Sequence, residues 1–543
     1  MYKTIFEKDE KLWKGYDIPP LYNPTISIAQ VLLNAMKING PKVAQISDDS
    51  KVEMTYDDIR LKTIRAAQNL QKRGHKENGV YSFIVANTDN VAPILFATFC
   101  NGCAVNGLDP SFKKFELIHM LGMVKPDLVI CDIDVYERAS ECLKELQNYA
   151  KIFTLGGCAD GSEPVDVLFN ETKIEDSFIP TTVDGLNDIA LITCSSGTTG
   201  MCKSVSLSHA ALINSILDYP LIGLSDTILC FSTIYWLSAW FFLLAGTFRG
   251  STRIITRKPF SPKLGLNLIE RFKINAILNT PHQVSMLLKS NEIDQADLST
   301  IKILIVSGSK FHLDTKIKIL NYLRNATICN GYGMSEVAGY ISCDFCGDLT
   351  KDTVGQILNG SQIKIVDENG SRCDVEVDGE ICIKPKYKFL GYYGSPNATN
   401  ELFDAEGFVK SGDIGHFDNE GKLYVVDRTK DLLNYCMFPI APSEIEEFLM
   451  ELSAISEACI VGIPDEFAKD LPAALIVRNK NVHITEDEVY QLVSDNLADS
   501  RKLRGGVYFV DSLPTTPSGK VKRKIAKAYA IELFNKNQAQ TTE

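Results

Sequence analysis

The stretch from Asp188 to Ser204, which reads DIALITCSSGTTGMCKS, is the part of the chain that decides the fold. It begins as an apolar run typical of a buried strand, and continues as small hydroxyl and glycine residues that end at Lys203. Glycine lets backbone N–H groups turn inward, and hydroxyl and ammonium groups add donors, so such a loop suits a polyphosphate. The stretch therefore predicts a strand that leads into a phosphate-binding loop.

Two other interpretations of this loop stay open from its residues alone. A P-loop has the pattern G-x-x-x-x-G-K-[ST], and Gly197, Lys203 and Ser204 fit three of its fixed positions. Cys202 stands where the second glycine belongs, and that glycine is the one that lets the backbone approach phosphate. The third interpretation is a surface turn without a ligand.

Outward from this loop, strand-like and helix-like segments alternate. Residues Val80–Val85, Leu128–Cys131, Ile152–Leu155 and Ile301–Val306 are short apolar runs typical of buried strands, and Tyr56–Gln71 has helical spacing. This alternation predicts an α/β fold with layered, largely parallel sheets.

The composition of the chain changes at a charged cluster, Asp427–Asp431, which predicts a linker and a hinge at 428–431. Beyond it, Ser443 and Glu446 fit a capping box that opens a helix. We therefore predict a large N-terminal domain over 1–428 and a small, mobile α+β C-terminal domain over 429–543.

The overall composition of the 543 residues limits the kinds of partner that the protein can bind. With 56 basic and 68 acidic residues the net charge is −12, which predicts no nucleic-acid partner. The most apolar run, Tyr235–Phe248, is shorter than the ~20 residues of a membrane helix, so we expect no integral membrane segment.

Fifteen cysteines without a secretory signal predict reduced thiols and a cytoplasmic protein. The C-terminal residues Thr541–Glu543 do not form the peroxisomal signal Ser-Lys-Leu. Of the two CxxC spacings, Cys100–Cys103 lies in an apolar run, and core packing is expected there rather than a metal site; Cys343–Cys346 is over two hundred residues away.

The loop from Ser195 to Lys203 resembles the phosphate loop of the acyl-adenylate-forming (AMP-binding) superfamily. That superfamily includes acyl-CoA synthetases, coumarate–CoA ligases, peptide-synthetase adenylation domains and beetle luciferases. Four further motifs occur in the same order, so the resemblance extends from Thr55 to Arg523 and is greatest to insect luciferase-like and coumarate-type acyl-CoA synthetases.

The resemblance implies a nucleotide site assembled from distant segments. The implied phosphate, adenine and ribose contacts are Ser195, Ser196, Gly197, Thr198, Thr199, Gly200, Lys203, Asn330, Gly331, Tyr332, Gly333, Ser335, Asp413 and Arg428. Glu336 and Thr198 are the implied ligands of Mg2+, whose preference for hard oxygen donors suits a carboxylate beside phosphates. Without the resemblance, 330–336 and Gly412-Asp413 would each be interpreted as ordinary turns.

The resemblance also implies the reaction: ATP and a carboxylic acid give an acyl-AMP, and coenzyme A then gives the thioester. Lys520, in a basic segment that alone would be a surface turn, is the implied catalytic lysine, and Lys430 occupies the hinge position. The implied acid-binding residues are His209, Tyr235, Trp236 and Gly308, and the apolar wall after Tyr235 suits a fatty or aromatic acid.

Several residues depart from the family pattern. Cys202 and Ser204 replace a proline and a glycine beside the loop lysine, and Trp236 replaces a histidine. Asn434 and Met437 stand in a stretch where relatives carry lysines and a glycine that lets pantetheine pass.

These departures define the alternatives. One is a catalytically impaired relative that binds a nucleotide or acyl group. A second is a luciferase-like monooxygenase. Ser215 argues against it, because beetle luciferases carry an arginine at the matching position. The P-loop phosphotransferase is the third, and it would release ADP rather than AMP and pyrophosphate.

Overall fold

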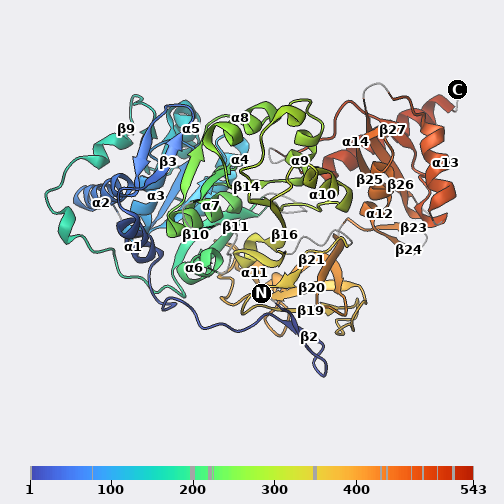
Figure 1. Cartoon of the computed structure of the whole chain (residues 1–543), viewed down its shortest axis with the longest axis horizontal. Coiled ribbons are helices and arrows are strands. Elements are labelled where there is room, and N and C mark those ends of the chain that lie inside the picture. Colours follow the sequence, from blue (N-terminus) through green and yellow to red (C-terminus); the bar gives the residue numbers. More distant parts are fainter. Residues whose placement is uncertain are drawn as a thin grey trace. The chain divides into compact units, whose positions relative to one another are not determined.

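The computed structural model describes residues 3–75, 77–195, 202–217, 223, 226–345, 351–428, 431–435, 438–465, 468–479, 482–497, 499–516 and 520–541. The chain forms two compact units (Figure 1). The large unit consists of Met1–Ser307, Leu313–Ile363 and Cys382–Lys410, and the small unit of Gly308–His312, Lys364–Ile381 and Ser411–Glu543. The predicted α/β architecture with a separate, small C-terminal part is confirmed.

Two mostly parallel sheets form the large unit. The nine-stranded sheet has the order β18-β17-β16-β15-β14-β12-β13-β3-β4, and the seven-stranded sheet the order β11-β10-β6-β5-β7-β8-β9. The strands of the first are β3 (Val43–Ser47), β4 (Glu53–Thr55), β12 (Thr227–Cys230), β13 (Thr252–Ile255), β14 (Ala276–Asn279), β15 (Ile303–Val306), β16 (Thr327–Met334), β17 (Gly339–Asp344) and β18 (Gln356–Ile357). Those of the second are β5 (Val80–Ile84), β6 (Ala104–Leu108), β7 (Leu128–Asp132), β8 (Lys151–Leu155), β9 (Glu163–Pro164), β10 (Ile189–Ser195) and β11 (Lys203–Ser208). The four strands predicted from apolar runs are confirmed as β5, β7, β8 and β15.

Helices connect and cover these strands. They are α1 (Ile28–Asn39), α2 (Tyr56–Lys72), α3 (Val91–Cys100), α4 (Lys114–Val124), α5 (Tyr136–Glu145), α6 (His209–Leu217), α7 (Leu237–Arg249), α8 (Pro262–Phe272), α9 (Pro281–Leu288), α10 (Leu313–Leu320) and α11 (Pro396–Leu402). Helix α2, predicted from its spacing, starts at a capping box of Thr55 and Asp58. Every residue of α3 is buried, and Cys100 and Cys103 pack in the core as expected, whereas Cys346 lies outside the described residues.

Most of the apolar run Tyr235–Phe248 forms α7, whose central residues are all buried. Within the described ranges, no helix combines the length and the apolar character that a membrane crossing requires.

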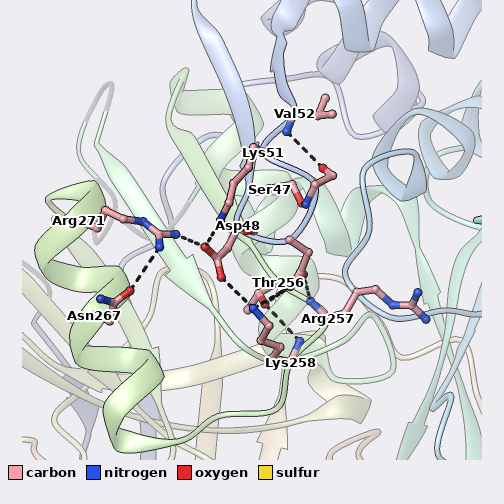
Figure 2. Close-up of polar contacts among 11 residues, drawn as sticks. Ser47, Asp48, Lys51, Val52, Thr256, Arg257, Lys258, Asn267 and Arg271 are labelled. Carbon is pink, nitrogen blue, oxygen red and sulfur yellow. Dashed lines mark hydrogen bonds and ion pairs between the residues drawn. The ribbon is translucent and has the colours of Figure 1, made fainter.

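A network of ion pairs joins the carboxyl ends of β3 and β13 to helix α8 (Figure 2). Asp48, whose side chain is only 4% exposed, meets the cationic groups of Lys51, Lys258 and Arg271. Arg257 extends the network to β7, because its guanidinium lies 3.5 Å from Asp132. The network therefore ties the two sheets of the large unit together.

The small unit contains a hairpin and a five-stranded sheet. The hairpin comprises β22 (Leu423–Arg428) and most of β21 (Val409–Phe417). The sheet comprises β23 (Leu433–Tyr435), β24 (Phe438–Ile440), β25 (Ile455–Asp465), β26 (Lys469–Arg478) and β27 (Val507–Phe509), with helices α12 (Pro442–Met450), α13 (Glu486–Asn496) and α14 (Arg523–Thr541). Four further strands are β1 (Ile5–Glu7), β2 (Leu12–Lys14), β19 (Gln362–Val366) and β20 (Gly379–Lys384); β1 pairs with β2, and β2 with the start of β19.

The predicted capping box at Ser443 is wrong. Helix α12 begins at Pro442 with Ala441 as its N-cap, and no side chain caps it. The Ser443 hydroxyl donates instead to the carbonyl of Val426, and Glu446 binds Arg523. Tertiary partners thus outcompete the local cap. The predicted hinge stays a prediction, since residues 429 and 430 lie outside the described residues.

Candidate active site

The predicted phosphate loop connects two antiparallel strands of the large unit. Strands β10 and β11 pair so that Ser195 lies opposite Lys203, which places both at the loop end of the hairpin. Ser196, Gly197, Thr198, Thr199 and Gly200, which carry most of the predicted phosphate contacts and one metal contact, lie outside the described residues. The predicted strand before the loop is confirmed, and the chain returns from the loop as a strand.

Tyr392, which the sequence interpretation missed, connects Lys203 to Glu336. The Tyr392 hydroxyl donates to Glu336 Oε1 over 2.8 Å, and the ammonium of Lys203 lies 4.6 Å from the centre of the Tyr392 ring. Glu336 is only 5% exposed. Burial, together with the carboxylate of Glu336, raises the pKa of Tyr392 far above its ordinary value, so the phenol keeps its proton and stays a donor.

Backbone pairing brings Tyr392 to this place. The amide of Ser206 donates to Gly391 O, and that of Tyr393 to Ser204 O, so the segment around Tyr392 pairs with the edge of β11. Tyr392 belongs to no periodic pattern, and a Gly-Tyr-Tyr triplet is no signal of a site. Sequence reasoning therefore had no means of finding it.

The predicted adenine segment forms the end of β16 and the tight turn into β17. Asn330 is buried and donates to the carbonyl of Thr353 over 3.2 Å. At Gly333 a side chain is excluded, because a Cβ would lie 1.9 Å from the carbonyl oxygen of Gly339. A Cβ at Gly331 would lie 2.8 Å from the ring of Tyr340.

Beyond β16, Ser335 and Glu336 lie in a 3-10 turn that closes on Ala338, whose φ is +62°. Tyr332 is half-buried on β16. The chain thus places the Glu336 carboxylate beside Tyr392 by a short turn rather than by a helix.

His209, a predicted acid-binding residue, lies in the core. It is the first residue of α6, is 0% exposed, and accepts a hydrogen bond from the amide of Ile28 at Nδ1, 3.3 Å away. Its ring packs edge-on against Phe99, and Nε2 has no hydrogen-bond partner among the described residues. Burial lowers the pKa of His209 to about 4, so the imidazole is neutral at physiological pH.

Tyr235 and Trp236 lie beside the return from the phosphate loop. The Tyr235 hydroxyl is 3.7 Å from the sulfur of Cys202, the residue before Lys203. The Trp236 ring packs edge-on against Tyr235, with 4.7 Å between ring centres. Tyr235 is buried and Trp236 half-buried, so the two aromatic rings support the phosphate hairpin from one side.

In the small unit, the predicted ribose residues form an ion pair across the hairpin. Asp413 on β21 lies opposite Arg428 on β22, and its Oδ1 is 3.0 Å from Arg428 Nε. The preceding Gly412 has φ of +71°, which favours glycine. Gly308 has φ of +99° with open space around it, so conformation rather than crowding favours glycine there.

Lys520 belongs to the same charged group of the small unit. Burial and the neighbouring Arg428 lower the pKa of Lys520 to about 8, while Asp413 and Asp431 oppose this shift. The loop around it is held by two hydrogen bonds between Thr516 and Lys520. Asp413, Arg428 and Lys520 therefore lie together although they are far apart in the sequence, and their roles stay predictions. Lys430 lies outside the described residues.

Comparison with known proteins identifies the family. The model of the AMP-binding enzyme family matches residues 34–393, and the model of the AMP-binding enzyme C-terminal domain matches residues 444–520. The chain belongs to the AMP-binding enzyme family, as its motifs predicted.

Named relatives extend over nearly the whole chain. A 4-coumarate–CoA ligase from Humulus lupulus is 29% identical over 88% of this chain and 89% of its own. A luciferin 4-monooxygenase from Photuris pensylvanica is 27% identical over 92% and 93%.

Two solved structures have the same fold. The luciferase-like enzyme of the nonluminescent Zophobas morio mealworm superposes with a TM-score of 0.71 at 27% identity, over 77% of this chain and 99% of that one. An anthranilate CoA ligase in complex with anthranoyl-AMP superposes with a TM-score of 0.84 at 18% identity, over 94% and 98%.

Proposed function

We propose that this protein is an AMP-forming acid–thiol ligase, which activates a carboxylic acid with ATP as its acyl-adenylate and then transfers the acyl group to coenzyme A. The single observation that carries the proposal is the meeting of Lys520, Asp413 and Arg428 in one charged group. These are the residues that the motif resemblance implies for nucleotide binding and adenylation.

In the first half-reaction, an oxygen of the acid attacks the α-phosphorus of ATP, and pyrophosphate leaves with the electron pair of the broken P–O bond. Two anions must approach each other, so fixed cations lower the barrier by opposing their repulsion. Lys520 supplies a positive charge to the carboxylate and the phosphoryl oxygens, and Asp413 accepts from the ribose hydroxyls.

The large unit would hold the polyphosphate and its Mg2+. The buried carboxylate of Glu336 is a hard oxygen ligand of the kind that Mg2+ prefers, and Mg2+ would neutralise phosphate charge. Tyr392 fits this role because its O–H fixes one oxygen of Glu336 and its ring faces the Lys203 ammonium. Thr198 is proposed as a further ligand, by kinship alone.

In the second half-reaction, the thiol of coenzyme A attacks the acyl carbon and AMP leaves. We propose residues 428–431, including Lys430, as the hinge about which the C-terminal domain, 429–543, rearranges between the steps. The named coumarate–CoA ligase relatives support this second step.

The test is product analysis with ATP, coenzyme A and a library of fatty and aromatic acids. AMP, pyrophosphate and an acyl-CoA are the expected products, and the same acids should drive ATP–pyrophosphate exchange. Absence of exchange with every acid, despite ATP binding in calorimetry, would favour the catalytically impaired relative. Release of ADP would contradict the proposal outright, and light emission with luciferin would favour the luciferase.

A further inference from the structure

A cavity of about 230 Å³ lies in the large unit between α6 and the segment Tyr16–Pro24, which we call the strap. The backbone of the strap is held at two points: Tyr16 O accepts from the amide of Gly360, and Ile18 O from the ammonium of Lys386, each over 2.7 Å. Between Ile18 and Tyr22, the side chains of Pro19, Pro20 and Leu21 line the cavity. We call it the strap cavity.

A second, smaller cavity of about 30 Å³ adjoins the first. Its wall includes Val337, Ala338 and Tyr340, which directly follow Glu336. The residues that line both cavities are Asn214, Asn359, Lys386 and Tyr387. The two cavities therefore share a wall, and we call its three polar side chains, Asn214, Asn359 and Lys386, the polar neck.

The side chains of the polar neck are available to a ligand. Asn359 is only 7% exposed, lines both cavities, and its amide makes no hydrogen bond to another described residue. A polar ligand group in the cavity would therefore find a hydrogen-bonding partner in this amide. The amide of Asn214 likewise has no hydrogen-bond partner in the described part of the chain.

The position of Lys386 depends on a glycine. A Cβ at Gly360 would lie 2.6 Å from Lys386 Cδ. Because Gly360 has no side chain, the aliphatic part of Lys386 can pass over its backbone and place the ammonium at the polar neck. Among the described residues that line the two cavities, none carries a carboxylate. One cation and two amides in such a lining suit an anionic oxygen group.

We propose that the polar neck binds a second carboxylate of the acid substrate, so that the preferred substrates are dicarboxylic acids. The inference rests on the proposed acyl-adenylating function. One carboxylate reacts beside Glu336, the carbon chain passes Ala338 and Tyr340, and the distal carboxylate meets Lys386. The Tyr340 hydroxyl is 2.7 Å from that of Ser307, which fixes the ring and narrows the path.

The test compares straight-chain dicarboxylic acids of increasing length with their monomethyl esters in ATP–pyrophosphate exchange. At the length that fits, the wild type should prefer the diacid about 10- to 100-fold in kcat/KM, the size expected for a charged hydrogen bond. Lys386→Met should remove this preference and leave the kcat/KM of the monoester within about twofold, because it keeps the stem and deletes the charge. Lys388→Met, an exposed lysine two residues on, is the matched control and should keep the preference.

Equal use of diacid and monoester at every length by the wild type would overturn the proposal, and so would an unchanged preference in Lys386→Met. If no acid supports exchange, the proposed function fails, and calorimetry with the dicarboxylates alone decides about the neck: binding that Lys386→Met abolishes supports it, and no binding overturns it. If Lys386→Met does not fold, Asn214→Ala on α6 takes its place, with the same expected loss of preference.

Discussion

Lys520 lies where its positive charge is disfavoured, which suits the catalytic role proposed for it but lowers the stability of the fold. Burial and Arg428 both disfavour its charge, and its pKa falls to about 8. Because the pKa in the folded state lies below that of an exposed lysine, the charged form destabilises the fold below pH 8, and this penalty disappears as the pH rises toward 10.5. A residue with only a structural role gains nothing from such an arrangement.

We predict that the kcat/KM of ATP–pyrophosphate exchange declines above about pH 8, where Lys520 loses its proton. Lys520→Arg should shift this decline beyond pH 9, and Lys520→Ala should lower exchange at least 100-fold. Lys520→Met should also raise the free energy of unfolding at pH 7, measured by urea denaturation. A pH profile that is the same in wild type and Lys520→Arg would contradict this assignment.

For Tyr392 we predict a role in fixing Glu336. Tyr392→Phe deletes the O–H that donates to the buried carboxylate, and should lower kcat/KM for ATP about tenfold, since a hydrogen bond to a charged group contributes roughly 1.5–3 kcal/mol. Tyr392→Leu also removes the ring that faces Lys203 and should cost more. Tyr393→Phe is the control, and an equal loss in that variant would show a general packing effect.

At the scale of elements, the short connections after the parallel strands position the charged groups. The turn after β16 brings Glu336 to Tyr392, and the end of β3 brings Asp48 into its cluster of cations. Burial alone would raise the pKa of Asp48, but hydrogen bonds from Lys51 and Arg271 lower it from 3.8 to about 2. The ion-pair network of Figure 2 thus stabilises the packing of the sheets and helix α8 and is not a second reactive site.

We predict that Asp48→Ala lowers the free energy of unfolding by about 2–3 kcal/mol at pH 7, because three cations lose their buried partner. In the wild type, the contribution of Asp48 is complete above pH 4 and is lost as the pH falls through about 2, since its folded pKa is depressed. Asp314→Ala removes an exposed pair with Lys318 and should cost under about 0.5 kcal/mol in the same urea titration. A similar loss of unfolding free energy in Asp48→Ala and Asp314→Ala would contradict the view that burial makes the Asp48 ion pairs stabilising.

At the scale of the whole molecule, the two half-reactions place different demands on the chain. Under the proposed function, groups of each unit act in adenylation, and the thioester step depends on the stretch after the proposed hinge. Met437 lies in that stretch, where the family resemblance implies a glycine, and is outside the described residues. The two steps should therefore respond separately to substitution.

We predict that Met437→Gly increases the rate of acyl-CoA formation about tenfold, because it restores the glycine that the resemblance implies for the passage of pantetheine, while ATP–pyrophosphate exchange changes less than twofold. Separate assays of exchange and of thioester formation measure the two steps. Met450→Ala at the end of α12 is the control. A parallel change in both assays would show that Met437 acts on adenylation or on folding instead.

The sequence by itself determined the fold class, the strands from Val80 to Val306 that were predicted, and the order of the motifs. Apolar runs and glycine-rich loops depend on local chemistry, which can be read along the chain. It also predicted that Lys520 acts with Asp413 and Arg428, through family resemblance.

Only the tertiary structure showed Tyr392 beside Glu336, the burial of His209 in the core, and the loss of the cap at Ser443 to Val426 and Arg523. Each of these depends on which segments, distant in sequence, pack together. That packing determines which polar group finds a partner, and no local pattern encodes it.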